Sequence, residues 1–243
     1  MVPSRMTSGR SLLLIADIGG YTEYMRSHRM SLAHAEVNTT RLLEKVIDAA
    51  PQYDLVEVEG DAAFMSRPAD GLGGDGAVAS TLEVATAMHR AFHVERRYVA
   101  TNLCPCKGCT EADNLKLKFV AHIGDVATQT IRQQRKLVGI DVILVHRMLK
   151  SGVEVPEYVL LSEELHGLAD GALPTPGQEV MQELDGIGPT RSYVVDVADL
   201  PGSSPPPAAP SMLTRLGKTL SVAGAGMPYM LGLRRGRRTS STG

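Results

Sequence analysis

Two aspartates of this 243-residue chain stand where a carboxylate is costly unless something binds it. Asp17 follows the apolar run LLLIA and is soon followed by two glycines, and Asp61 follows Gly60 between two short strand-like runs. An ionised carboxylate at the exit of a core needs a hydrogen bond, an opposite charge or a metal. Aspartate is also an ordinary turn former and helix cap, so both interpretations stand for each residue.

The coincidence of the two aspartates favours a metal site. If the first strand and the hairpin lie in one sheet, Asp17 and Asp61 approach each other, and like charges repel unless a cation lies between them. Hard oxygen ligands suit Mg²⁺ or Mn²⁺, which proteins commonly share with substrate phosphates. We therefore predict that Asp17 and Asp61 bind a divalent metal.

The elements that must position these residues follow from hydrophobic periodicity and turn signals. In chain order we expect a strand at 11–17, a helix from Ser31 to Pro51, two strands within 53–67, a helix at 78–99, a strand pair within 115–131 broken at Gly124, a helix at 139–152, and strands at 157–162 and 192–197 separated by a short helix at 162–168. The first part of this order is the ferredoxin-like βαββαβ plan. The predicted fold class is α+β, with extra C-terminal strands.

Bulk composition excludes several classes of protein. Hydrophobic residues make up 43% and charged residues 21%, as in soluble globular proteins, and a net charge of −2 gives no field that favours nucleic acid. No apolar run reaches the roughly 18 residues of a membrane-spanning helix, and the N-terminus lacks the apolar core of a signal peptide. Three cysteines within six residues do not make a disulfide framework, which favours a reducing, cytoplasmic setting.

The chain divides by composition into four parts. We expect a disordered N-terminus at 1–10, one domain at 11–200, a proline-rich linker at 201–211 and a basic, apolar tail at 212–243. The tail would suit weak contact with an anionic membrane surface. Its glycines and Pro228 favour a disordered tail, or part of a linker to a further domain, instead.

Five segments, in this order, resemble the class III adenylate/guanylate cyclase family: ADIGGYTEYM, VEVEGDAAFM, VAHIGDV, KLVGIDVILVHRMLKSG and EYVLLSEEL. The resemblance covers about residues 12–197 and rests on the order and spacing of the motifs. It implies a homodimeric cyclase homology domain that holds a purine nucleoside triphosphate with two metals. Asp17 and Asp61 would be the metal ligands. In the family, the ribose 3′-hydroxyl attacks the α-phosphorus and pyrophosphate leaves.

The catalytic residues of the family are only partly matched. Its transition-state arginine, eight residues beyond the glycine at Gly139, falls on Arg147, whose guanidinium suits a developing phosphorane. A solvated helix residue is the alternative for Arg147. The ribose-orienting asparagine of the family is replaced by Ile143, which cannot hydrogen-bond a sugar, and loss of a positioning contact can cost about a hundredfold in rate.

The residues that read the base are exchanged in charge. By the same resemblance, Glu57 and Lys136 occupy the two base-reading positions, where adenylate cyclases have lysine and aspartate. Glu57 can accept from guanine N1–H and the 2-amino group, and Lys136 can donate to guanine O6, so GTP is favoured over ATP. The alternative is a plain Glu57–Lys136 ion pair that closes an unused pocket.

The cysteines form a separate motif, C-x-C-x-x-C, at Cys104, Cys106 and Cys109. Clustered thiolates are typical of zinc or Fe–S sites. Tetrahedral zinc needs a fourth ligand, for which we predict His93, with His89 one helical turn earlier. Three reduced cysteines without a metal are the alternative to a structural zinc site.

These features lead to a nucleotide cyclase-like signalling domain that binds a purine triphosphate with Mg²⁺ or Mn²⁺. Ile143 predicts that cyclase activity is weak or lost, as in a pseudoenzyme. An active divergent guanylate or adenylate cyclase, and a zinc-stapled, non-catalytic dimerisation or regulatory module, are the alternatives.

Overall fold

The computed structural model describes residues 8–27, 32–102, 111–132, 134–169, 171, 173, 176–203 and 217. The elements are β1 (Ser8–Gly19), α1 (Tyr21–Ser27), α2 (Leu32–Asp48), β2 (Asp54–Glu59), β3 (Ala62–Pro68), α3 (Gly74–Asn102), a 3₁₀ turn (Ala112–Asn114), β4 (Lys116–Ile131), β5 (Gln134–Val138), α5 (Ile140–Met148), β6 (Tyr158–Ser162), α6 (Glu163–His166), β7 (Gln178–Leu184), β8 (Gly188–Asp196) and a second 3₁₀ turn (Val197–Asp199).

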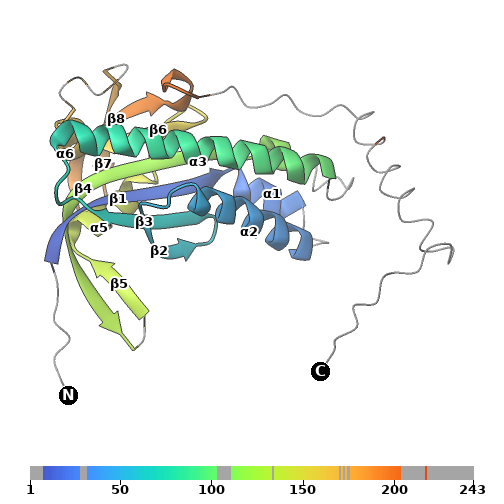
Figure 1. Ribbon diagram of the computed structural model, residues 1–243, viewed down its shortest axis with the longest axis horizontal. Helices are drawn as coiled ribbons and strands as arrows, with labels where there is room; N and C mark the ends of the chain where they lie inside the picture. The colour runs from blue at the N-terminus through green and yellow to red at the C-terminus, as the bar shows by residue number, and fades with distance from the viewer. Residues whose placement is uncertain are drawn as a thin grey trace, which may run out of the picture.

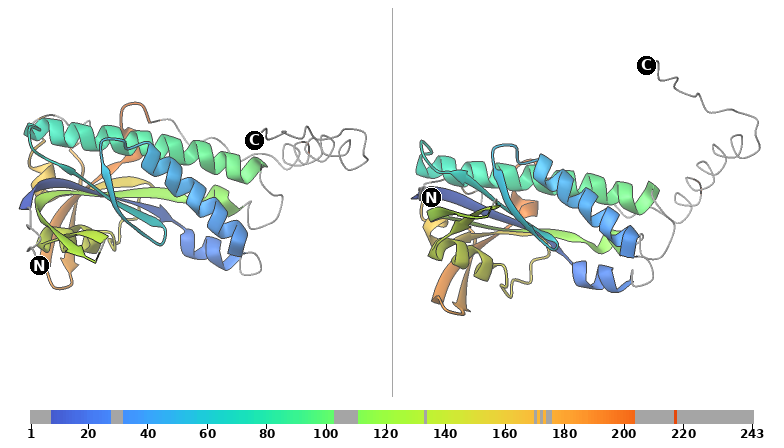
Figure 2. Two further views of the ribbon diagram at one scale, coloured as in Figure 1. Left: turned by 60° about the horizontal axis from the view of Figure 1, so that its bottom comes forward. Right: turned by 90° about the horizontal axis from the view of Figure 1, so that it is seen from below.

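One eight-stranded sheet organises the molecule. Its strand order is β2-β3-β1-β4-β6-β8-β7, with β5 paired to the far part of β4. All pairs are antiparallel except β4 with β6. Helices α2 and α3 cover one face, and the β4–β5 arm projects from the body (Figure 1). Figure 2 shows α2 and α3 side by side over this face in two further views. The predicted α+β class and ferredoxin-like core, β1-α2-β2-β3-α3-β4, are confirmed.

Strict alternation along β1 builds two cores, because successive strand residues point to opposite faces. Leu12 and Leu14 are buried against the α2/α3 face with Phe92 of α3. Leu13 and Ile15 are buried on the other face with Val145 of α5. A strand buried on both faces reads as one apolar run, which is why LLLIA marks the centre of the sheet.

The predicted strand break at Gly124 is wrong, because β4 runs unbroken from Lys116 to Ile131. Gly124 makes room instead: a Cβ there would lie 2.3 Å from Cγ of Asp141 and 2.5 Å from Nε2 of His122. The hairpin partner is the separate strand β5. Helix α1 and strand β7 were not predicted, and β1 begins at Ser8, three residues earlier than expected.

Within the described residues, none of the helices is both long and apolar enough to cross a membrane. The predicted linker and tail, apart from residues 201–203 and 217, lie outside the described residues.

Candidate functional site

Asp17 and Asp61 meet at one end of the sheet. In the register of the ladders Asp17 lies opposite Ala62 of β3 on one side and Lys118 of β4 on the other. The next backbone N–H, of Ile18, donates to the carbonyl oxygen of Asp61 at 3.1 Å. The hairpin turn is thereby tied to the end of β1, as the sequence predicted.

The electrostatics of this pair are unfavourable for two carboxylates. The pKa of Asp17 is raised from its ordinary 3.8 to about 6, mainly by burial and also by the charge of Asp61, while Lys118 opposes the shift. Burial also raises the pKa of Asp61, against a lowering backbone hydrogen bond. A bound cation would favour the ionised form of both groups. Two half-buried, hard oxygen donors with raised pKa values therefore fit Mg²⁺ or Mn²⁺.

Glu57 and Lys136 are brought together from the edge strand β2 and the arm strand β5. Lys136 Nζ lies 3.2 Å from each carboxylate oxygen of Glu57, and both side chains are about two-fifths exposed. Lys136 also lines a cavity of about 300 Å³ beside β2 and β3. The ion pair that we considered is thus formed, and recognition of a base by these residues stays a prediction.

Arg147, on α5, forms an ion pair with an acidic residue that the sequence did not suggest. Its Nη1 lies 2.7 Å from Oδ2 of Asp185, in the turn between β7 and β8. Among the described residues, no hydrogen bond or ion pair joins Arg147 to Asp17 or Asp61. Ile143, on the same helix, is 48% exposed and presents a hydrocarbon surface.

A buried histidine that the sequence analysis left without a role lies beneath α5. His122 Nδ1 is 2.8 Å from Oγ of Ser162, and Nε2 is 3.1 Å from Oδ1 of Asp141. Asp141 also accepts from the backbone N–H of Asp125 at 2.7 Å. These contacts anchor the N-terminus of α5 to β4. The same helix carries Ile143 and, in its last turn, Arg147. The only sequence signal was the histidine of VAHIGDV within an otherwise apolar strand.

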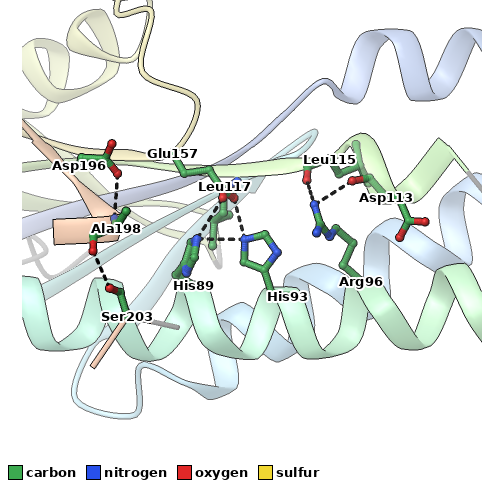
Figure 3. A network of polar contacts seen from close by, with 10 residues as sticks. All are labelled: His89, His93, Arg96, Asp113, Leu115, Leu117, Glu157, Asp196, Ala198 and Ser203. Carbon is green, nitrogen blue, oxygen red and sulfur yellow. Dashed lines mark hydrogen bonds and ion pairs between the residues drawn. The ribbon is translucent and has the colours of Figure 1, made fainter. Parts of the chain in front are cut away.

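His93, predicted as a zinc ligand, contacts two residues of a second polar cluster. Its Nε2 lies 2.9 Å from Nε2 of His89 and 2.8 Å from Oε1 of Glu157 (Figure 3). His89 Nε2 is 3.2 Å from Oε2 of the same carboxylate. Cys104, Cys106 and Cys109 lie outside the described residues, so a zinc site that joins them to His93 stays a prediction.

Glu157 is held ionised in this cluster. Burial alone would raise its pKa, but hydrogen bonds from His89 and His93, the charge of His93 and the backbone N–H of Leu117 hold it well below the usual range. Burial lowers the pKa of His93, against its hydrogen bond to Glu157.

The sequence of this chain matches a protein-family model and a mycobacterial relative. A family described as "Protein of unknown function (DUF2652)" matches residues 39–158. The uncharacterized protein Rv2561/Rv2562 of Mycobacterium tuberculosis is 36% identical over 198 residues, which span 80% of this chain and 90% of that protein.

Solved structures of nucleotide cyclases superpose on most of the domain. The guanylyl cyclase Cya2 matches with a TM-score of 0.63 and 15% identity, over 83% of this chain and 96% of that chain. The guanylate cyclase domain of RhGC from Catenaria anguillulae, in complex with GTP, matches with a TM-score of 0.56 and 19% identity, over 77% and 97%. The chain therefore belongs to the family of the mycobacterial protein Rv2561/Rv2562, and its fold is that of class III nucleotide cyclase domains.

Proposed function

We propose that this protein binds a purine nucleoside triphosphate with Mg²⁺ or Mn²⁺ and that its cyclase activity is weak or lost. The observation that carries the proposal is the meeting of Asp17 and Asp61, two half-buried carboxylates whose pKa values are raised at the end of β1. Such a pair gains from a divalent cation, and a cation there would offset the charge of triphosphate oxygens. The complex of a similar domain with GTP supports a purine nucleotide as the ligand.

Glu57 and Lys136 would select the base. The carboxylate of Glu57 can accept from guanine N1–H and the 2-amino group, whereas adenine offers no proton at N1. Lys136 can donate to guanine O6. Because both side chains are about two-fifths exposed, their ion pair is worth at most about 1 kcal/mol and can open to admit a base.

Two features oppose turnover. Ile143 leaves the ribose without the hydrogen bond that the resemblance assigns to this position, and misplacement of a reacting group is costly. Arg147 is engaged by Asp185, so it must leave this partner before it can reach a nucleotide.

A second copy of the chain would complete the nucleotide site. Exposed apolar side chains on β2 and α5, namely Leu55, Val58, Ile140 and Ile143, are between 46% and 61% exposed and would suit a homodimer contact. An active divergent cyclase remains the alternative, favoured by the presence of both aspartates and Arg147. A zinc-stapled regulatory module would bind zinc and no nucleotide. A cytoplasmic location fits each of these roles.

The deciding experiment measures nucleotide binding and product formation together. We expect Mn²⁺-dependent binding of GTP that is tighter than that of ATP, is lost in Asp61→Asn, and is accompanied by little or no cyclic product. A cyclic nucleotide that forms readily and disappears in Asp61→Asn would establish the active-cyclase alternative. Binding that is equal in the wild type and Asp61→Asn would overturn the metal site.

A further inference from the structure

We propose that His89, His93 and Glu157 form a second metal site, for Zn²⁺, on the opposite face of the sheet from Asp17. The two histidines lie one turn apart on α3, at i and i+4, so both imidazoles project from the same side of the helix. Glu157 immediately precedes β6 and approaches them from the sheet. The site is independent of nucleotide binding.

The distances suit a small tetrahedral cation. Zinc binds histidine nitrogen and carboxylate oxygen at about 2.0–2.2 Å, which separates neighbouring ligand atoms by about 3.3 Å. Here His93 Nε2 lies 2.8 Å from Oε1 of Glu157 and 2.9 Å from Nε2 of His89, and His89 Nε2 lies 3.2 Å from Oε2 of Glu157. An opening of at most about half an ångström between these atoms would admit the ion.

Hydrogen bonds alone cannot satisfy all the contacts among His89, His93 and Glu157. A neutral imidazole carries one proton, on one of its two nitrogens. If both Nε2 atoms carry protons, the N–H groups of His89 and His93 crowd each other at 2.9 Å. If only one does, the bare Nε2 of the other faces an oxygen of Glu157 with no proton between them. Every arrangement of neutral rings leaves one contact repulsive, whereas a divalent cation accepts a lone pair from each of the three side chains.

Neighbouring groups hold the carboxylate of Glu157 in place, as outer hydrogen bonds do for metal ligands. The β4–β6 ladder begins at Phe119 and Val159, so the backbone N–H of Leu117 lies beyond the ladder. That N–H donates instead to Oε1 of Glu157 at 3.0 Å, and such outer contacts orient metal ligands. The positive charge of Arg96, one turn beyond His93, is turned toward the carbonyl oxygens of Asp113 and Leu115 (Figure 3).

The burial of the three side chains favours tetrahedral zinc over octahedral iron. The side chains of His89 and His93 are 6% and 4% exposed, and that of Glu157 is 12% exposed. Little room remains for the several open positions of an octahedral iron site, whereas tetrahedral zinc needs one further ligand, for which a water suffices. A zinc ion here would fasten α3 to the start of β6 and act as a structural clamp.

The test uses the full chain with Cys104, Cys106 and Cys109 all changed to serine, which separates this site from any thiolate site. Cobalt replaces zinc as the probe, because a tetrahedral nitrogen and oxygen site gives visible bands without thiolate charge transfer. We expect one Co²⁺ per chain that gives these tetrahedral bands and is displaced by Zn²⁺. Glu157→Gln or His93→Gln should weaken binding at least about 100-fold, since even outer-contact losses cost 10–100-fold.

Glu154→Gln is the matched control, because the same change is made three residues away at an exposed position. Failure of the cysteine-free protein to bind Co²⁺, or equal affinity of Glu157→Gln and Glu154→Gln, would overturn the proposal. If the serine variant does not fold, ¹⁵N spectra of wild-type histidines decide. Added Zn²⁺ must then shift the Nε2 resonances of both His89 and His93, and unshifted resonances would contradict the site.

Discussion

Asp17 and Glu157 lie on opposite faces of one sheet, beside neighbouring rungs of the β1–β4 ladder. Asp17 is opposite Lys118, and Leu117, opposite Ile18, donates its N–H to Glu157. Asp17 faces a second carboxylate, and its pKa is raised by burial and by Asp61. Glu157 faces two imidazoles and a backbone donor, and its pKa is lowered although burial opposes this.

The contrast shows that burial alone does not decide the state of a carboxylate. Both groups are desolvated, but donors surround Glu157 while Asp17 has a like charge as neighbour. The surroundings of Glu157 therefore favour its ionised carboxylate before any ion binds. The Asp17 pair carries a cost that a bound cation would remove, as expected of a site that binds a ligand.

The largest expected effect comes from removing the carboxylate of the donor-rich cluster. Glu157→Ala leaves His89, His93 and the N–H of Leu117 without their acceptor. We expect the free energy of unfolding of the metal-free protein to fall by about 3 kcal/mol, as for other broken buried pairs. Urea unfolding measures it, with the exposed Glu154→Ala as the control, and equal curves for the two variants would contradict the comparison.

Removing the charge of Asp17 is expected to raise the stability of the protein rather than lower it. Asp17→Asn removes a charge that burial and Asp61 disfavour, so the metal-free protein should become more stable at pH 7 by about 1 kcal/mol. The full pKa shift of about 2 units corresponds to about 3 kcal/mol, and partial exposure reduces this figure. The same variant should lose the stabilisation that Mn²⁺ gives the wild type. A thermal melt with and without Mn²⁺ tests both expectations.

The pH dependence sharpens the contrast. Because folded Asp17 has its pKa near 6 and the unfolded chain near 3.8, the folded state binds more protons between these values. The contribution of Asp17 to stability therefore falls as pH rises from about 4 to about 6. The stability that metal-free Asp17→Asn gains over the wild type should therefore grow with pH over this window, and the two proteins should match at pH 4. A difference that persists unchanged at pH 4 would mean that charge is not the cause.

The smallest effect is expected at the exposed ion pair of α5. Asp185 is 88% exposed, so Asp185→Ala should change the free energy of unfolding by less than about 0.5 kcal/mol. If Arg147 contacts nucleotide, the same change should increase GTP affinity, and Asp185→Ala in an Arg147→Ala background should not. Isothermal titration of the two proteins would show the difference.

The sequence predicted well where the signals are local. The hairpin around Gly60 and the helices α2, α3 and α5 follow from apolar periodicity and turn residues. The strand β1 was also predicted, although it continues past the expected end at Asp17 to Gly19. Gly124 was misread, because a glycine that makes room for Asp141 looks the same in a sequence as one that breaks a strand. Arg147 and Asp185 are 38 residues apart, so no spacing rule could pair them.

The second cluster could be predicted only in part for the same reason. His89 and His93 share a helical face, which the sequence indicated, but Glu157 is 64 residues beyond His93. Its position follows from the parallel β4–β6 pairing, a long-range contact with no local pattern. The sequence therefore placed His93 near the cysteines, its nearest ligand types along the chain.

The unbroken strand β4 has a consequence for insertions and deletions. From one end to the other it carries Leu117, which holds Glu157, then Lys118 beside Asp17, His122 beneath α5, and finally the arm that pairs with Lys136. Adding or deleting one residue near its start would turn every following side chain to the other face. Length variation should therefore be tolerated in the surrounding loops, and almost nowhere between residues 116 and 131.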